Sequence, residues 1–357
     1  MPQPRTIRRT AGRTTPARAA RRLRILAGIG GLLLFGIAYA VLGASGGSSS
    51  DRRASNLRAS NPHTLNRPAP PGTPRLIARL SPNRLPAAVS GEAAAAGAGG
   101  VLVIGGLNSA DVSTDSVFRV DPTTGIAASA GALAEPLHDA AAAQTAGHVL
   151  VFGGGSLTEL DSVESLSAGG RGALVGRLPS ARSDLSAVAV GAYIYVLGGY
   201  DGQAPIGAVL RTTNGRTFRT VAELPVPFRY AAVTAVGNLI YTFGGELANG
   251  SDSNAIQVID TSTGRASVIG RLTRPVSHAS AVTLGGRILI MGGRSHEAAT
   301  NRILAFDPTS HRLSLAGRLP LPVTNSAAAR TGNAVYLLGG LDAAGKTLAS
   351  VIKIQQL

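Results

Sequence analysis

The sequence predicts an all-β fold built from six similar repeats, and two observations lead to this prediction. The first is a Gly-Gly pair that recurs along the chain, at Gly105-Gly106, Gly153-Gly154, Gly198-Gly199, Gly244-Gly245, Gly292-Gly293 and Gly339-Gly340. Successive pairs are 48, 45, 46, 48 and 47 residues apart, and each ends a short apolar run such as VLVIGG or YIYVLGG. Such a period is typical of repeat proteins, in which each unit buries its apolar face against its neighbours.

The second observation is the constant spacing of other residues before each pair. A leucine lies 20 residues before every Gly-Gly, at Leu85, Leu133, Leu178, Leu224, Leu272 and Leu319. Twelve residues before five of these leucines the chain enters a turn-type sequence such as DPTTG or DTSTG. A stretch of 32 residues therefore repeats without insertion, and the length varies only in the segment after each pair.

Each repeat is predicted to hold four short strands. In the third repeat they cover about residues 185–190, 193–197, 207–211 and 217–223. A turn containing Gly or Asn joins the first two strands of every repeat, as tight hairpins require. Four antiparallel strands repeated six times predict a six-bladed β-propeller over residues 75–357.

The two ends of this region are predicted to complete one blade together. Residues 350–357 match a third strand with no fourth strand after it. The missing outer strand is expected within residues 75–85, although Pro82 leaves its register open. A blade closed by strands from both ends would hide sheet edges that would otherwise be exposed.

Three segments are predicted to precede the propeller. Residues 1–24 form a basic cytoplasmic tail, and residues 25–43 are 19 uncharged residues, enough for one transmembrane helix acting as a signal-anchor. The preceding arginines favour a cytoplasmic N-terminus and an extracytoplasmic propeller on a cell membrane. Residues 44–74 are rich in Ser, Pro and Arg and are predicted to be a flexible linker.

A cleaved signal peptide is the alternative for this N-terminal segment. Ala38-Tyr39-Ala40 fits a small-x-small cleavage site, which would give a secreted protein. The apolar run continues past this site, which favours the uncleaved anchor.

Charge and cysteine content exclude several classes of function. Residues 1–91 hold 15 Arg and one acid, whereas residues 92–357 hold 17 Arg, two Lys and 18 acids, a net charge of only +1. The propeller therefore lacks the basic surface of a nucleic-acid-binding domain. The absence of cysteine excludes disulfides, thiolate metal sites and cysteine nucleophiles.

The repeats resemble kelch repeats over about residues 75–357. The resemblance rests on the doubled glycine after the second strand, the apolar third strand with Tyr or Phe, and the DPxTG turn. One feature departs from the family. The positions where kelch blades usually carry a Trp hold Ala127, Gly172, Phe218, Ala266 and Leu313.

This resemblance implies a propeller that serves either as a binding module or as an enzyme. A copper site like that of galactose oxidase needs a cysteine, which this chain lacks. The sialic-acid mutarotases are exported six-bladed kelch proteins, so an activity of their kind is the enzymatic alternative.

Candidate site residues follow from the register. Five residues after each leucine lie Ser90, His138, Ser183, Arg229, Ser277 and Thr324. Six residues after it lie Gly91, Asp139, Asp184, Tyr230, His278 and Asn325. Because these positions enter the innermost strands, we expect two polar rings around the mouth of a central channel.

We predict that the loop-face mouth binds a ligand through Asp139, Asp184, Arg229, Tyr230, His278 and Asn325, joined by Tyr200 and Arg294 from the loops after the Gly-Gly pairs. The alternative is structural: polar side chains cap loop backbones at exposed strand ends. No phosphate-binding loop, zinc spacing, calcium loop or Ser-His-Asp order is present, so no catalytic residue, cofactor or metal is assigned.

Two functions are compatible with these residues. The first is a membrane-tethered module whose loop face binds an extracytoplasmic protein or glycan, because scaffolds commonly keep their core fixed and vary their recognition loops. The alternative is an extracytoplasmic sugar-processing enzyme that uses Arg229, His278 and the two aspartates. The sequence leaves the oligomeric state open.

Overall fold

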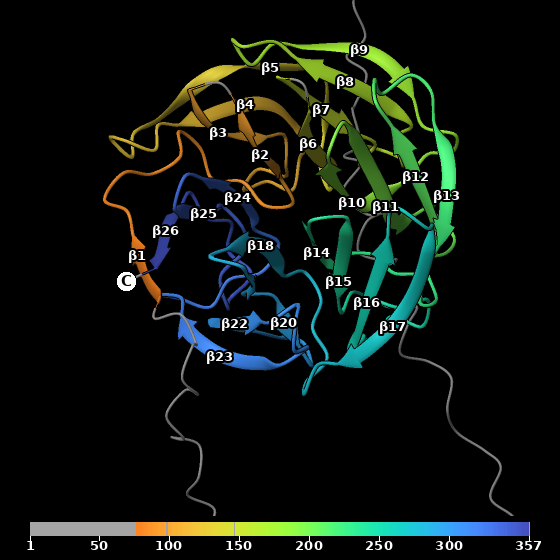
Figure 1. Cartoon of the computed structure of the whole chain (residues 1–357). Helices are drawn as coiled ribbons and strands as arrows, with labels where there is room; N and C mark the ends of the chain where they lie inside the picture. The colour runs from red at the N-terminus through yellow and green to blue at the C-terminus, as the bar shows by residue number, and fades with distance from the viewer. Residues whose placement is uncertain (1–75, 98, 146, 357) are drawn as a thin grey trace, which may run out of the picture. The chain divides into compact units, whose positions relative to one another are not determined.

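The computed structural model describes residues 76–97, 99–145 and 147–356, which form six four-stranded antiparallel sheets arranged around a central axis (Figure 1). The all-β, six-bladed propeller predicted from the repeats is confirmed. The predicted tail 1–24, transmembrane segment 25–43 and linker 44–74 lie outside the described residues. Among the residues that are described, no helix is long and apolar enough to cross a membrane.

Five blades follow the order of the chain from the innermost to the outermost strand. Blade 1 contains β2 (Ala93–Gly97), β3 (Gly100–Ile104), β4 (Thr114–Val120) and β5 (Ala127–Leu137). Blade 2 contains β6 (Ala141–Thr145), β7 (His148–Phe152), β8 (Ser162–Leu166) and β9 (Gly172–Arg177). Blade 3 contains β10 (Ser183–Val190), β11 (Tyr193–Tyr200), β12 (Ala208–Thr212) and β13 (Arg219–Glu223).

Blade 4 contains β14 (Ala232–Val236), β15 (Leu239–Phe243), β16 (Ala255–Asp260) and β17 (Arg265–Arg271). Blade 5 contains β18 (Ser280–Leu284), β19 (Arg287–Met291), β22 (Arg302–Phe306) and β23 (Leu313–Arg318). A two-stranded hairpin, β20 (Arg294–Ser295) and β21 (Ala298–Ala299), is inserted between its second and third strands.

Blade 6 joins both ends of the described chain, as predicted. It contains β24 (Ala327–Thr331), β25 (Ala334–Leu338), β26 (Val351–Gln356) and β1 (Leu76–Leu80). The outer strand β1 pairs antiparallel with β26, from Leu76 opposite Gln356 to Leu80 opposite Ile352. Because β1 ends at Leu80, Pro82 lies beyond the strand and removes no hydrogen bond from it.

The hydrophobic core is divided into six clusters, each lying between two neighbouring blades. One of them packs Ile104 and Val117 of blade 1 against Val149 and Val151 of blade 2. The innermost strands carry mostly small residues, such as AAAAG in β2 and AAAQT in β6. Small side chains allow six strands to converge on the axis, while the larger Val, Ile and Leu fill the space between blades farther out.

Each Gly-Gly pair lies against the segment that leads from its own blade into the next one. The first glycine has φ between +54° and +67°, and the second has φ between +85° and +102°. The second glycine donates its N–H to a carbonyl that lies just before the innermost strand of the following blade, for example Gly106 to Leu137, the last residue of β5, and Gly245 to Val276, at 2.9 and 2.8 Å. A Cβ on Gly105 would lie 2.7 Å from the Leu137 oxygen. The pairs are therefore glycine because of both their backbone conformation and this close approach.

A second ring of backbone hydrogen bonds closes around the axis. It is formed by the residues six positions after each leucine, and each N–H donates to the carbonyl of its counterpart in the neighbouring blade. The bonds run from Asn325 through Gly91, Asp139, Asp184, Tyr230 and His278 back to Asn325, at 2.6–3.2 Å. This ring fixes the spacing of the six positions around the channel mouth.

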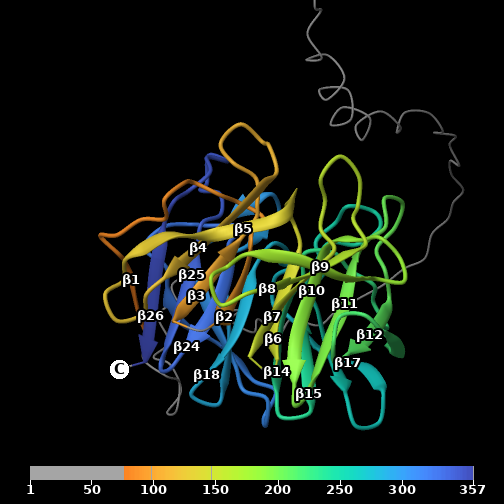
Figure 2. The ribbon, with the colours of Figure 1, turned by 90° about the horizontal axis from the view of Figure 1, so that it is seen from above.

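The loops after the Gly-Gly pairs lie on the same face as the entrances to the innermost strands. In every blade the first residue after the Gly-Gly pair forms a β-bridge with the residue five positions after the regularly spaced leucine. Examples are Leu107 with Ser90 and Glu246 with Arg229. Figure 2 shows the loops of blades 1 and 2, in orange and yellow-green, rising on this face. We call this side the loop face.

We expect Gly244→Ala to destabilise the propeller strongly. Its Cβ would overlap the carbonyl oxygen of Val276, whereas a Cβ on Gly250, which also has positive φ, meets nothing within 4 Å. Gly250→Ala should cost about 1–2 kcal/mol of unfolding free energy, the usual penalty for a left-handed alanine. Gly244→Ala should cost about 1–3 kcal/mol more because of the overlap. Urea unfolding of both variants measures the difference, and equal losses would contradict the close-approach explanation.

Candidate functional site

Left-handed backbone at the ring explains many of its residue types. All six positions have φ between +51° and +62°. Gly, Asn, Asp and His adopt this conformation more readily than other residues, which fits Gly91, Asp139, Asp184, His278 and Asn325. The backbone conformation thus explains most residue types at this ring, and side-chain capping of loops stays an alternative prediction. Tyr230 is the exception, because a bulky aromatic residue is strained at φ +55°.

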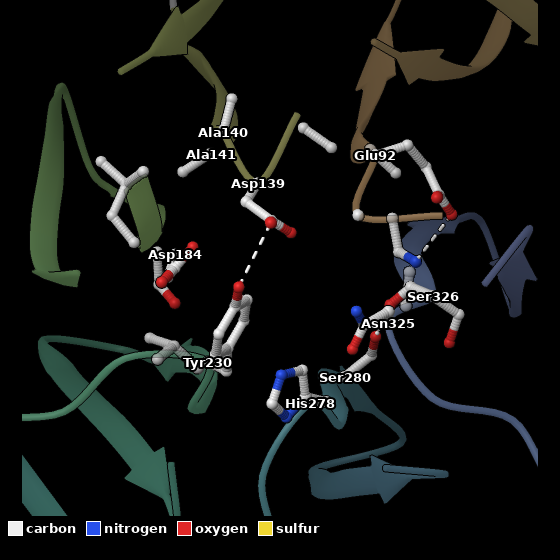
Figure 3. Close-up of a pocket in the computed structure, with 18 of the residues that line it drawn as sticks. Glu92, Asp139, Ala140, Ala141, Asp184, Tyr230, His278, Ser280, Asn325 and Ser326 are labelled. Carbon is white, nitrogen blue, oxygen red and sulfur yellow. Dashed lines mark hydrogen bonds between the residues drawn. The ribbon is translucent and has the colours of Figure 1, made fainter. Parts of the chain in front are cut away.

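The ring surrounds a cavity at the channel mouth (Figure 3). Its volume is about 180 Å³, and its lower wall is formed by small residues of the innermost strands. Ser186, Ser280 and Ser326 add hydroxyl groups to this wall. Figure 3 shows the labelled polar side chains arranged around one open space, contributed by different blades.

Three carboxyl groups line the cavity, from Glu92, Asp139 and Asp184. Glu92 is 6 % exposed and Asp184 is 7 % exposed. Burial raises the pKa of Glu92 to about 8 and the pKa of Asp184 to about 6, although the Arg229 guanidinium partly opposes the shift at Asp184. Burial and the neighbouring Asp184 charge also raise the pKa of Asp139 well above its usual range. Glu92 is therefore protonated near neutral pH, and the pKa values of both aspartates are raised in the same direction.

Tyr230 and His278 form a stacked aromatic pair between these acids and Asn325. Their ring centroids are 3.9 Å apart and the ring planes differ by 23°. The Tyr230 hydroxyl donates to Asp139 Oδ2 at 3.2 Å (Figure 3). Burial, helped by the Arg294 and Arg229 charges, lowers the pKa of His278 to about 3, so its imidazole is neutral.

A network of ion pairs surrounds the cavity on the loop face. Arg229 Nη2 lies 2.9 Å from Glu246 Oε1, and Arg294 Nη2 lies 2.5 Å from Glu246 Oε2. Arg229 Nη1 also lies 3.6 Å from Asp184 Oδ2, which connects this rim to the cavity. The Arg229 guanidinium lies over the Tyr200 ring, 4.8 Å from its centroid.

The serine before His278 links the rim to the aromatic pair. Ser277 Oγ lies 2.8 Å from His278 Nδ1 and donates to Asp252 Oδ1 at 2.6 Å. Arg294 Nε donates to the same Ser277 oxygen at 3.1 Å. Because the Ser277 hydroxyl donates its hydrogen bond to Asp252, its oxygen accepts one from His278 Nδ1–H. Nε2 is then the acceptor nitrogen of the neutral imidazole.

The structure brings all eight predicted site residues together. Asp139, Asp184, Tyr230, His278 and Asn325 line the cavity. Arg229, Arg294 and Tyr200 lie in the surrounding rim network. A ligand-binding role for them stays a prediction.

Sequence reasoning missed Glu92, the most buried acid of the cavity. Glu92 lies seven residues after Leu85, where the other five repeats have Ala140, Leu185, Ala231, Ala279 and Ser326. A glutamate at a position otherwise occupied by small or apolar residues was the available signal. Glu246 and Asp252 were visible as loop acids, but their pairing with Arg229 and Arg294 depends on the loop conformations.

The described residues contain no cluster of three or more His, Asp and Glu side chains arranged to hold a metal ion. The three cavity acids come from three blades, and Asp139 and Asp184 are engaged by Tyr230 and Arg229. The cavity acids, serine hydroxyls and the Asn325 amide supply hydrogen-bond donors and acceptors.

Comparison with known proteins identifies the repeats. The Kelch motif matches residues 275–312, which cover the fifth Gly-Gly pair and the following DPTSH turn. The chain is a kelch-repeat propeller. Among solved structures it is similar to that of YjhT, with a TM-score of 0.65 and 15% sequence identity over 76% of this chain and 99% of the other. No curated protein matches the kelch chain in a sequence search.

We expect Glu92 to make the stability of this kelch propeller fall as pH rises. Because its pKa is raised in the folded state, the folded protein holds a proton that the unfolded chain releases between about pH 4.5 and 8. The unfolding free energy should therefore drop by roughly 2–4 kcal/mol across this window through Glu92. Below about pH 6.5 the unfolded chain protonates His278 while the folded protein keeps it neutral, so this residue makes the unfolding free energy rise with pH there. Above pH 6.5 the raised pKa values of Glu92 and Asp139 both make the unfolding free energy fall as pH rises.

Urea unfolding of Glu92→Gln across pH 6.5–8 tests this expectation. The variant should lose the part of the decline that Glu92 causes and keep the part that Asp139 contributes, whereas Glu223→Gln, the same change at an exposed position, should retain the full decline. A decline of equal size in the Glu92→Gln variant would contradict the assignment.

Proposed function

We propose that this kelch propeller is a glycan-binding module that holds one sugar unit in the axial cavity. The observation that carries the proposal is the lining of the cavity. It combines carboxyl, phenol, amide and imidazole groups with serine hydroxyls in a space of about 180 Å³. A cavity of about 150 Å³ is known to hold benzene, so one six-membered ring fits this size.

The hydrogen-bonding groups match the chemistry of a sugar. Sugar hydroxyls both donate and accept, and the cavity offers protonated and ionised carboxyls, the Asn325 amide and a neutral His278. The stacked rings of Tyr230 and His278 add an apolar surface suited to sugar C–H groups. The strain stored at Tyr230 supports this reading, because strained residues concentrate at functional sites.

A glycan fits this site better than a folded protein partner. The titratable groups are recessed and mostly buried, so a flat protein surface would reach only the rim loops. A protein partner would therefore depend on loop residues such as Leu157, whose side chain is 95% exposed, and not on the cavity acids.

Binding of a panel of mono- and oligosaccharides to the purified full-length chain tests the proposal. Asp184→Asn and Tyr230→Phe should each weaken binding about 5- to 100-fold, because each removes a buried hydrogen-bonding partner worth about 1–3 kcal/mol. Asp115→Asn, on an exposed position of β4, is the matched control and should bind normally. Isothermal titration calorimetry gives the affinities. Sugar binding that is unchanged in both cavity variants, or no binding by any sugar, would contradict the proposal.

Interconversion of sugar anomers is a second candidate, favoured by the proton-transfer groups. Asp184 with a pKa near 6 and Glu92 with a pKa near 8 line one cavity, a pairing suited to accept and donate a proton around neutral pH. His278, with its pKa lowered to about 3, is a weak base. We therefore assign proton transfer to the acids and not to His278, the residue favoured by the sequence. The acidic wall favours a neutral aldose over an anionic sugar.

We expect the wild-type chain to accelerate anomer equilibration of an aldose that it binds. The double variant Glu92→Gln/Asp184→Asn should lose this acceleration by 100-fold or more, as removal of general acid–base catalysis typically does. One-dimensional NMR of the anomeric protons measures the rate. Binding without any acceleration would leave the chain a binding module.

We also propose that residues 25–43 tether the propeller to a membrane, with the loop face outside the cytoplasm. The support is the uncharged run of 19 residues preceded by an arginine-rich segment. Sequencing of the mature N-terminus from membrane fractions should find the intact start. A mature start near Val41 would contradict the anchor and indicate a secreted protein.

A further inference from the structure

A second cavity is formed by blade 5, apart from the axial cavity. Its volume is about 210 Å³, and none of its lining residues also lines the axial cavity. One wall is the segment 273–276, which leads from β17 into β18. Another is the β20–β21 hairpin inserted in this blade, through Ser295, Ala298 and Ala299. We call this space the blade 5 cavity.

The blade 5 cavity has an apolar part. Val276, Ile290 and Leu304 line it, and the same three side chains belong to the hydrophobic cluster between blades 4 and 5. A cavity of about 150 Å³ is known to hold benzene, so this larger space accommodates one aromatic ring with a short substituent. A ligand of this cavity is therefore expected to have a small apolar body.

Two arginines, Arg274 and Arg302, line the same cavity, and no acidic residue does. Within the described part of the chain, neither guanidinium has a hydrogen-bond or ion-pair partner. Burial lowers the pKa of the Arg302 guanidinium, and the nearby charges of Arg274 and Arg318 lower it further. Arg302 still keeps its positive charge, because arginine stays protonated in proteins. The cavity therefore carries positive charge that no described acid offsets.

Arg302 is also an exception among the blades. It lies opposite Arg318 in the pairing of β22 with β23, whereas the matching positions in blades 2, 3 and 4 hold Ser162, Ala208 and Ala255. Like charges directly opposite each other destabilise a sheet. The fold alone thus gives no reason for an arginine at this position, whereas a bound anion would offset the repulsion.

We propose that the blade 5 cavity binds a small carboxylic acid with an apolar body, of the size of an aromatic acid. The carboxylate lies between Arg274 and Arg302, because a planar guanidinium donates two parallel hydrogen bonds to such a group. The apolar body contacts Val276, Ile290 and Leu304. This site is independent of the proposed sugar binding, which uses other residues.

Matched aromatic compounds test this assignment on the full-length chain. Benzoate and phenylacetate are compared with benzamide and phenylacetamide, which keep the ring and lack the charge, and with inorganic phosphate, which has the charge and lacks the ring. Saturation-transfer NMR in a buffer free of phosphate and carboxylate gives the affinities of the aromatic compounds, and competition gives that of phosphate. At least one carboxylate should bind about 10-fold or more tightly than its amide and than phosphate. Because arginine and carboxylate both stay charged, this affinity should be constant between about pH 6 and 8.

Arg302→Gln and Arg274→Gln should each weaken carboxylate binding about 10-fold or more, with little change for the amide. Arg302→Gln should also raise the urea midpoint of the free protein, because it removes the like-charge pair with Arg318. Arg312→Gln, the same change at an exposed position of blade 5 outside the cavity, should bind normally. Arg274 is exposed, so Arg274→Gln provides the test even if Arg302→Gln does not fold.

Three results would overturn the proposal: equal binding of each carboxylate and its amide, no binding by any of these compounds, or carboxylate binding that survives both cavity variants. Tighter binding of phosphate than of either carboxylate would overturn the organic acid and indicate an inorganic anion. Sugar binding to the same variants is measured separately and should be unchanged, since the two cavities share no residue.

Discussion

The close contact between neighbouring blade backbones is the constraint on which the rest of this propeller depends. At each Gly-Gly pair, a backbone hydrogen bond joins a blade to the segment that enters the next blade, at a distance that a side chain would prevent. The second ring of hydrogen bonds, around the axis, repeats the contact six positions after each leucine. Together they set where the innermost strands begin, and therefore the width of the channel mouth and the positions of its side chains.

The same constraint produces a site as a by-product of the scaffold. A closed ring of residues in the left-handed backbone conformation favours Gly, Asn, Asp and His. The last three bring amide, carboxyl and imidazole groups to the axis. Polarity at this ring is thus required by the fold before any ligand is considered. Two residues are not explained by this backbone requirement: Tyr230, in a strained conformation, and Glu92, one position farther along.

The sequence was sufficient to predict the features that recur at the same distance from the leucine in every repeat. Equal spacing from the leucines placed Asp139, Asp184, Tyr230, His278 and Asn325 around one axis, and the unpaired third strand at the C-terminus required an outer strand from the N-terminal side. Features that break the register were not predicted. Glu92 is one, and Arg182 is another, since it is 2% exposed at a position that holds Val or Leu or Phe elsewhere. The rim ion pairs were beyond reach because they depend on loops of unequal length.

Closure of blade 6 also determines how this molecule would respond to mechanical force. β1 is the first strand of the propeller, and it is held in its sheet by pairing with β26, a strand from the other end of the chain. Tension applied through the segment before Leu76 would reach this pairing before any other part of the propeller. Because β1 is the outermost strand of one blade, its release would expose the edge of β26 while the five other blades and the ring at the axis kept their own hydrogen bonds. The pairing of β1 with β26 can therefore open under tension without disrupting the hydrogen-bonded ring at the axis.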